Sequence, residues 1–229
     1  MDIKSKNAMA RLVAEWEASG ACGARETADG GTVYKVALAM ARGGYRHSRQ
    51  TVEAVSKYLS GAGLWMQGGC GTGKTYFFDR IEAARESLNI QGRKLYMLPM
   101  SQLVTWGKGE LWAWLDRVRL HDVLLDDVGV EVVENDYGRK FEVLPTILDR
   151  RLSAYGRTHF TTNLDTAAIR KRYGAGAFDR MRSLACRITL VSESLRRDGV
   201  RVRYTLPTWP PLPGEEMYRV PVIGEAAEA

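Results

Sequence analysis

The chain has 229 residues, of which 45% are hydrophobic and 26% are charged, and its formal net charge is +6. This length and composition predict one main globular core with small attachments, and they exclude a collagen-like, largely disordered or disulfide-dense protein. The charge is uneven, because the segment from Arg139 to Arg203 holds fifteen Lys and Arg against six Asp and Glu. Such a segment is typical either of a surface that binds a polyanion or of a solvated, arginine-rich face.

Two further features bear on where the protein works. No apolar run approaches the roughly 18 residues that a membrane helix needs, and charged residues interrupt the first apolar stretch, which argues against an export signal. Cys22, Cys70 and Cys186 lie far apart and form no metal-ligand spacing. We therefore expect a cytoplasmic protein in a reducing compartment, without membrane association.

Helical periodicity dominates the first sixty residues. Apolar residues between Met9 and Trp16 recur on one helix face. Further helices are predicted at residues 33–41 and at residues 48–60, where Ser48 is placed to cap the helix. A glycine-rich stretch separates the first of these helices from the second and is expected to be a loop.

From residue 62 onward, short apolar strands alternate with helices. This alternation is typical of a mostly parallel sheet covered by helices on both faces. The expected strands are residues 62–67, 94–98, 122–126, 158–162 and 187–191. The expected helices are residues 76–88, 101–119, 141–155 with Pro145 at its start or at a kink, a helix that Asp165 caps, and residues 178–185.

The pattern divides the chain into three parts. Residues 1–47 form a helical extension that is a candidate region for binding a partner. Residues 48–200 form the α/β core, which contains all the expected strands. Residues 201–229 hold most of the seven prolines, and we expect this tail to be extended or loosely ordered.

A phosphate-binding loop is the strongest motif. Residues 68–75, GGCGTGKT, match the pattern GxxxxGK[ST] in full, after a predicted strand and before a predicted helix. The four glycines are expected to take positive-φ conformations and to turn backbone N–H groups around an anion at the helix N-terminus. Lys74 is expected to contact the β and γ phosphates of ATP, and the Thr75 hydroxyl to ligate Mg²⁺. The predicted nucleotide-binding residues are Gly68, Gly69, Cys70, Gly71, Thr72, Gly73, Lys74 and Thr75.

An acidic pair ends a later strand. Asp126 and Asp127 follow the apolar run VLL, which suits a magnesium-directing carboxylate beside the phosphates. Asp126 is expected to hold Mg²⁺ through water, and Asp127 to polarise the attacking water as general base. A capped turn is the structural alternative for this pair.

Seven motifs follow one another in the region from Leu59 to Arg197: WMQGGCGTGKTYF, LLDDVGVE, NDYG, LPTILDRRL, TTNL, YGAGAFDRMR and SLRR. In order and spacing they resemble the AAA+ ATPases, and most of all the DnaC-type helicase loaders. The resemblance implies an α/β P-loop core with a five-stranded, mostly parallel sheet. It also implies a minimal or absent lid, since few residues follow the last predicted strand.

The resemblance implies roles for single residues. Asn163, which ends a strand in TTN, is similar to the sensor 1 residue that orients the hydrolytic water. Arg180 in FDRMR is similar to the arginine finger, which enters the site of a neighbouring subunit in a homo-oligomer and stabilises charge on the transferring phosphoryl group. Arg196 in SLRR is similar to the sensor 2 arginine.

The helical pattern agrees with an outward-facing Arg180. Phe178, Met181 and Leu184 mark the buried face of the predicted helix and turn Arg180 away from it. An ordinary exposed arginine is the structural alternative. Small residues follow the Tyr-Gly pair at a place where the family often carries an arginine, so Arg182 is a second candidate for the trans position.

The acidic pair departs from the family pattern. Many AAA+ enzymes have Asp-Glu where this chain has Asp126-Asp127. The shorter second side chain is expected to place the base less well, and this predicts slow turnover.

A tryptophan-rich segment, SQLVTWGKGELWAWLDRVRL, lies between the second and third predicted strands. Its location resembles the extra helix with which initiator and loader ATPases track single-stranded DNA. Physically, an exposed indole can stack on a base while nearby cations anchor phosphates. The predicted DNA-binding residues are Trp106, Lys108 and Arg117. The alternative is that Leu111, Trp112 and Leu115 form a core stripe.

The resemblance therefore implies an ATP-dependent loader of a replicative DNA helicase. ATP bound between subunits would favour a ring-like or helical assembly that holds the helicase open while single-stranded DNA enters, and hydrolysis would release it. Two alternatives are an IstB-like transposition helper, which addresses a transposase, and a non-hydrolysing ATP-dependent scaffold. A small-molecule kinase shares the phosphate loop but would leave TTN and FDRMR without a role.

Overall fold

The computed structural model describes residues 3–18, 28–104, 108–131, 135–136, 139–140, 143–191, 194 and 204–207. Within these residues, five strands form one sheet in the order β2-β3-β6-β1-β7. The strands are β1 (Leu64–Gly68), β2 (Leu95–Pro99), β3 (Asp122–Asp126), β6 (Thr158–Thr162) and β7 (Cys186–Leu190). Every neighbouring pair is parallel, so the expected five-stranded, mostly parallel sheet is confirmed.

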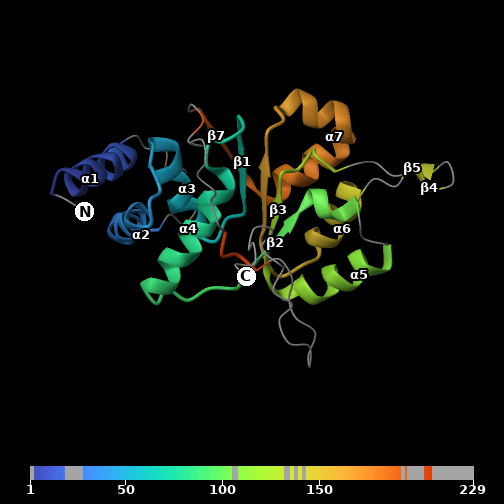
Figure 1. Ribbon diagram of the computed structural model, residues 1–229, viewed down its shortest axis with the longest axis horizontal. Coiled ribbons are helices and arrows are strands. Elements are labelled where there is room, and N and C mark those ends of the chain that lie inside the picture. The colour runs from blue at the N-terminus through green and yellow to red at the C-terminus, as the bar shows by residue number, and fades with distance from the viewer. Residues whose placement is uncertain are drawn as a thin grey trace, which may run out of the picture.

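Helices cover both faces of this sheet (Figure 1). One layer holds α1 (Ile3–Ala18), α2 (Gly30–Arg42), α3 (Arg49–Leu59) and α4 (Lys74–Ser87), and the other holds α5 (Lys108–Arg117), α6 (Val143–Leu152) and α7 (Thr166–Leu184). Two short 3-10 helices, η1 (Met100–Val104) and η2 (Val118–Leu120), flank α5, and β4 (Asn135–Asp136) pairs with β5 (Arg139–Lys140) in a separate ribbon. No helix in the described ranges combines the length and the apolar character that crossing a membrane requires.

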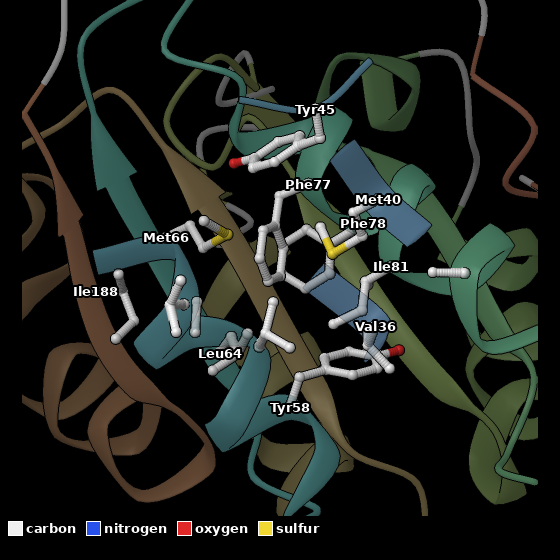
Figure 2. Close-up of a cluster of buried hydrophobic side chains, with 14 of the residues drawn as sticks. Val36, Met40, Tyr45, Tyr58, Leu64, Met66, Phe77, Phe78, Ile81 and Ile188 are labelled. Carbon is white, nitrogen blue, oxygen red and sulfur yellow. The ribbon is translucent and has the colours of Figure 1, made fainter. Parts of the chain in front are cut away.

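Figure 2 shows the core between the sheet and the layer of α1 to α4. Phe77 and Phe78 of α4 are fully buried in it, among side chains such as Met40 of α2 and Ile188 of β7. Trp16 of α1 belongs to the same buried cluster. The helices of the N-terminal segment therefore share the main core of the α/β unit.

The core on the opposite face explains the tryptophan-rich segment. Leu111, Trp114 and Leu115 of α5 are buried there, and Trp112 is half-buried with the guanidinium of Arg150 at 4.6 Å from its ring centroid. In the described part of the segment, the leucines thus form a core stripe. The described residues of the predicted helical segment 101–119 are helical, but they divide into an α-helix with a 3-10 helix on each side of it.

Local sequence sets where several helices begin. The Ser48 side chain accepts a hydrogen bond from the Thr51 N–H, and the Thr51 hydroxyl accepts one from the Ser48 N–H, which caps α3 as predicted. Asp165 caps α7 by accepting from the Ala168 N–H. Pro145 lies in the first turn of α6, where its missing N–H costs no hydrogen bond, so it starts the helix and does not kink it.

Residues 204–207 of the tail pack against β2 and α4. Leu206 is buried in the core between the sheet and the layer of α1 to α4. The carbonyl oxygen of Pro207 accepts a hydrogen bond of 2.9 Å from the Met97 N–H. The Thr205 hydroxyl donates to the buried carboxylate of Asp79 at 2.8 Å.

Two histidines, the buried His159 and the half-buried His47, make the free energy of unfolding depend on pH. His159 of β6 is fully buried, and its Nδ1 accepts a hydrogen bond of 3.0 Å from the Leu64 N–H, which requires the neutral ring. Burial, together with nearby arginines, holds the pKa of His159 well below 6.5. Burial likewise lowers the pKa of His47 from 6.5 to about 4. Both histidines are therefore neutral structural residues in the folded protein.

We expect the free energy of unfolding to fall as the pH is lowered from about 7 to about 5. The unfolded histidines bind protons below about pH 6.5 and the folded ones do not, so each adds a slope of up to about 1.4 kcal/mol per pH unit in this window. Denaturant unfolding at a series of pH values measures the slope. His159→Asn should have a shallower slope than wild type, and equal slopes would contradict the assignment.

Candidate functional site

The phosphate-loop motif lies at the carboxyl end of β1, where the chain turns into α4. In the sheet, β1 is flanked by β6 and β7, and β6 separates it from β3. Because these strands are parallel, their carboxyl ends meet at one edge, which is where open α/β sheets bind ligands. The strand order thereby brings together the loop, the acidic end of β3 and the residues that follow β6 (Figure 1).

Two glycines of the loop have the positive φ angles that were expected of four. Gly71 has a φ of 79° and Gly73, which caps α4, a φ of 85°. Gly68 and Gly69 do not have positive φ, so this part of the prediction is wrong. Gly68 is needed for a different reason, since a Cβ there would lie 2.7 Å from the carbonyl oxygen of Leu190 in β7. The loop leads into the N-terminus of a helix, a position that favours a bound anion.

Lys74 places its ammonium over this loop. Its side chain is 5% exposed, and Nζ donates to the carbonyl oxygens of Gly68 at 2.9 Å and Gly69 at 2.7 Å. Nζ also donates to Oδ1 of Asn163 at 2.7 Å. The structure thus brings together the predicted phosphate-binding lysine and the predicted sensor residue, which are 89 positions apart in the sequence.

A second pair joins the loop to β3. The Thr75 hydroxyl donates to Oδ1 of Asp126 at 2.8 Å, and the Thr161 hydroxyl of β6 donates to the same oxygen at 2.6 Å. Burial raises the pKa of the Asp126 carboxyl, and the neighbouring charge of Asp127 adds to this, although the two hydroxyls act in the opposite direction. A buried carboxylate that is costly to ionise is a site where a cation binds favourably.

These side chains suit a magnesium ion. Hydroxyl and carboxylate oxygens are the hard ligands that Mg²⁺ prefers, and it usually completes its shell with waters and phosphate oxygens. The Thr75 hydroxyl donates its proton to Asp126 in a hydrogen bond. Its oxygen lone pairs are therefore left to accept a cation. No cluster of three or more His, Cys, Asp or Glu side chains suited to a metal occurs among the described residues. Thr75 and Asp126 supply two oxygen ligands, so a Mg²⁺ ion at this site would be held jointly with phosphate and water oxygens.

Asp127 lies beside Asp126 with an unusual backbone. Its φ is 57°, and its N–H donates to the Thr161 hydroxyl at 2.8 Å. Asp tolerates this left-handed conformation better than most residues. Its carboxylate accepts no hydrogen bond from the part of the chain that the structure describes, and it is half-buried. The carboxylate is therefore open to a water molecule at this edge.

The sequence did not single out Thr161 and Glu131. Thr161 holds both aspartates, but this becomes visible only when β6 is known to lie between β1 and β3. Glu131 is 4% exposed, and its carboxylate accepts from the Gly129 N–H at 2.8 Å and from the Tyr173 hydroxyl of α7. Burial and this carboxylate raise the pKa of Tyr173. Glu131 thereby ties the turn after β3 to α7.

Arg180, the predicted trans arginine, contacts α6 and none of the nucleotide-site residues described above. Arg180 of α7 forms an ion pair of 2.6 Å with Asp149 of α6, and its side chain is 38% exposed. Phe178 and Met181 of the same helix are buried, as expected. Arg182, the second candidate, is exposed, and its guanidinium lies 6.0 Å from the Phe178 ring centroid. Entry of either arginine into a neighbouring subunit's site stays a prediction.

Several predicted residues fall outside the described part of the chain. Arg196 and Trp106 are among them, and of Lys108 only the backbone is described, at the start of α5. Arg117 is half-buried at the end of that helix. Cys70 is an exposed free cysteine in the loop. The predicted roles of Arg196, Trp106, Lys108 and Arg117 therefore stay predictions.

Comparison with known proteins finds similar folds but no close relative. No protein-family model and no curated protein sequence matches the chain. The chain is similar to the crystal structure of DnaI, at 24% identity and a TM-score of 0.44, over 59% of this chain and 73% of that one. It is similar to the DnaC helicase loader, at 19% identity and a TM-score of 0.48, over 65% and 94%. AMPPCP-bound DnaA from Aquifex aeolicus is similar at 16% identity and a TM-score of 0.41, over 63% and 48%.

The assignment of a P-loop α/β fold to this chain rests on its own sheet order and loop position.

We expect Thr161→Val to weaken magnesium-dependent nucleotide binding, because the hydroxyl positions Asp126 and Asp127. Thr162→Val is a matched control, since the Thr162 hydroxyl is equally buried but bonds to the Val128 carbonyl and the Leu164 N–H. Each variant should lose about 1 to 3 kcal/mol of stability through unsatisfied polar groups. Nucleotide affinity titrated against Mg²⁺ should change in the first variant alone, and equal effects in both would refute the role of Thr161.

Proposed function

We propose that the chain is an ATP-dependent loader of a replicative DNA helicase and that bound ATP switches the contact between its subunits. One observation carries the nucleotide part of the proposal. At one edge of the sheet, Lys74 meets Asn163 at 2.7 Å and Thr75 meets Asp126 at 2.8 Å. A glycine-rich turn with a purely structural role would need neither of these long-range pairs. The loader part follows from the order and spacing of the motifs.

The loop and Lys74 would bind the triphosphate. Backbone N–H groups around Gly71 and Gly73, together with the first turn of α4, supply donors for phosphate oxygens. Lys74 would exchange the Gly68 and Gly69 carbonyls for the β and γ phosphates. The Asn163 amide would then be released from the ammonium and could orient water beside the γ phosphate.

Thr75 and Asp126 would hold Mg²⁺, the first through its hydroxyl and the second through water. The ion supplies charge neutralisation on the phosphate oxygens when it is bound. Asp127 would accept a proton from the attacking water, for which its open carboxylate is suited. Arg180 from a neighbouring subunit would stabilise the charge that develops on the phosphoryl group.

In the proposed switch, the γ phosphate bridges two subunits. The γ phosphate would join Lys74 of one subunit to Arg180 of the next, so its loss on hydrolysis would weaken the interface. Arg180 would have to leave Asp149 for this contact. An exposed ion pair contributes only about 0 to 1 kcal/mol, so the exchange costs little.

A non-hydrolysing scaffold is a second candidate, and Asp127 favours it. Its side chain is one methylene shorter than the glutamate of many AAA+ enzymes, and its backbone is fixed in a left-handed conformation by Thr161. Phosphate release, measured with and without single-stranded DNA, distinguishes the candidates. Turnover excludes the scaffold, and ATP binding without turnover excludes the hydrolytic switch.

Arg180→Ala should abolish ATP-dependent assembly, whereas Asp149→Ala should not. Both variants break the same ion pair and should lose a similar, small amount of stability, so they form a matched pair. Sedimentation or light scattering with ATP and Mg²⁺ measures the assembly. Loss of assembly in both variants, or in neither, would refute the trans role of Arg180.

The helicase partner needs a separate experiment. With ATP, the intact protein should capture the replicative helicase of its own source and load it onto a closed circle of single-stranded DNA, and Lys74→Ala should fail to do so. Capture of a transposase in place of the helicase would favour the IstB-like alternative and overturn the loader proposal.

A further inference from the structure

A pocket that the nucleotide site does not use lies against the edge strand β7. It has a volume of about 360 Å³ and is lined by Trp65, Arg170, Phe178, Arg182, Ala185 and Arg187. Trp65 of β1 is paired with Arg187 of β7 in the parallel register, and the other lining residues come from α7 and its end. The pocket therefore lies between α7 and the outer two strands of the sheet.

The open face of β7 explains why the pocket exists. Ile188 and Leu190 point to the opposite face and are buried in the core with α1 to α4. Arg187 and Thr189 alternate with them and are exposed, although α7 covers the neighbouring strand on this side. Polar residues on the exposed face of a strand are usual. In this protein, the exposed face of β7 also lies beside Arg170 and Arg182 of α7.

The polar lining of the pocket consists of hydrogen-bond donors. Arg170, Arg182 and Arg187 are exposed, and no carboxylate in the described ranges pairs with any of them. The Trp65 indole N–H is buried and has no hydrogen-bond partner among the described residues. Guanidinium and indole groups have no acceptor, so an occupant of this pocket must supply acceptors and negative charge.

Two of the arginines are held in place by one ring. The guanidinium carbon of Arg170 lies 4.2 Å from the Phe178 ring centroid, and that of Arg182 lies 6.0 Å from it. Phe178 is 5% exposed, and its ring packs edge-on against Trp65 at 5.7 Å. A guanidinium that lies over an aromatic face keeps its N–H groups at the rim, where they can donate to an oxyanion.

We infer that this pocket binds phosphate groups in the backbone of single-stranded nucleic acid. The inference rests on the proposed function, in which the chain contacts single-stranded DNA, and it adds a second contact surface away from the tryptophan-rich segment. Three arginines that have no carboxylate partner among the described residues attract a chain of phosphates more strongly than they attract a lone carboxylate. The three arginines of the pocket also belong to the segment of residues 139–203, in which Lys and Arg outnumber Asp and Glu by fifteen to six.

The contact is made with the backbone and not with the bases. Phe178 is buried and its ring is occupied by arginines, so it offers no face for base stacking. Binding at this pocket is therefore independent of base sequence and strongly dependent on salt.

The test compares Arg170→Gln/Arg187→Gln with wild type and with Arg93→Gln. Arg93 is an exposed arginine just before β2, at the opposite edge of the sheet, and controls for the loss of surface charge. Arg182 is left unchanged because it is a candidate for the trans position. Binding of a fluorescent oligothymidylate of about 20 nucleotides is measured at several salt concentrations, and binding of a fluorescent ATP analogue is measured in the same samples.

The double variant should bind the oligothymidylate on the order of tenfold more weakly near 0.1 M salt. Its slope of log affinity against log salt should be shallower by about 0.7 for each arginine removed. Affinity for the ATP analogue should stay unchanged in all three proteins, and oligodeoxyadenylate should give the same loss. Arg93→Gln should keep most of the wild-type affinity.

Equal DNA affinity and salt slope in the double variant and the wild type would overturn the inference while leaving the proposed function intact. If a fluorescent hexaglutamate peptide then bound the wild type and not the double variant, the pocket would belong to an acidic protein segment. Displacement of the oligonucleotide by millimolar inorganic phosphate at constant ionic strength would equally overturn it, in favour of a free-phosphate site. Failure of the wild type to bind ATP would instead refute the proposed function.

Discussion

The hydrogen bond from Thr75 to Asp126 depends on the order of the strands. It joins the loop after β1 to the end of β3, although these two strands are not neighbours in the sheet. The strand between them, β6, places Thr161 within reach of the same carboxylate oxygen and is followed by Asn163, which contacts Lys74. The candidate site is therefore a consequence of the sheet topology as much as of the motifs.

Local patterns were enough to predict most of the elements. Apolar runs gave the five strands to within two residues, and the caps Ser48 and Asp165 were correct because a cap depends only on residues next to it in the sequence. Periodicity predicted the helical segment at residues 101–119 but not its division into an α-helix and two 3-10 helices. The role of Gly68 was also missed, because it depends on the approach of Leu190 from another strand.

The arginines of residues 139–203 serve more than one structural purpose. Arg151 is 1% exposed and donates to the backbone carbonyls of Val118, Gly156 and others, and burial lowers its pKa to about 10. Arg157 pairs with the buried Asp122. These two residues hold the ends of strands and helices together. The arginines of the pocket beside β7 form no hydrogen bond or ion pair of this kind with the described residues. Only some of the positive charges in residues 139–203 are therefore available to bind a ligand.

Residues 68–75, together with Asp126, are proposed to form a site for ATP and Mg²⁺. Isothermal titration of the wild-type protein with ATP, once in magnesium buffer and once with the metal removed by chelation, tests it most directly. We expect saturable binding at one site per chain, markedly tighter with Mg²⁺, and none in either buffer for Lys74→Ala, whose folded state is checked by circular dichroism. A folded wild-type protein that takes up no ATP in magnesium buffer, or binds it equally well with and without the metal, would contradict the account.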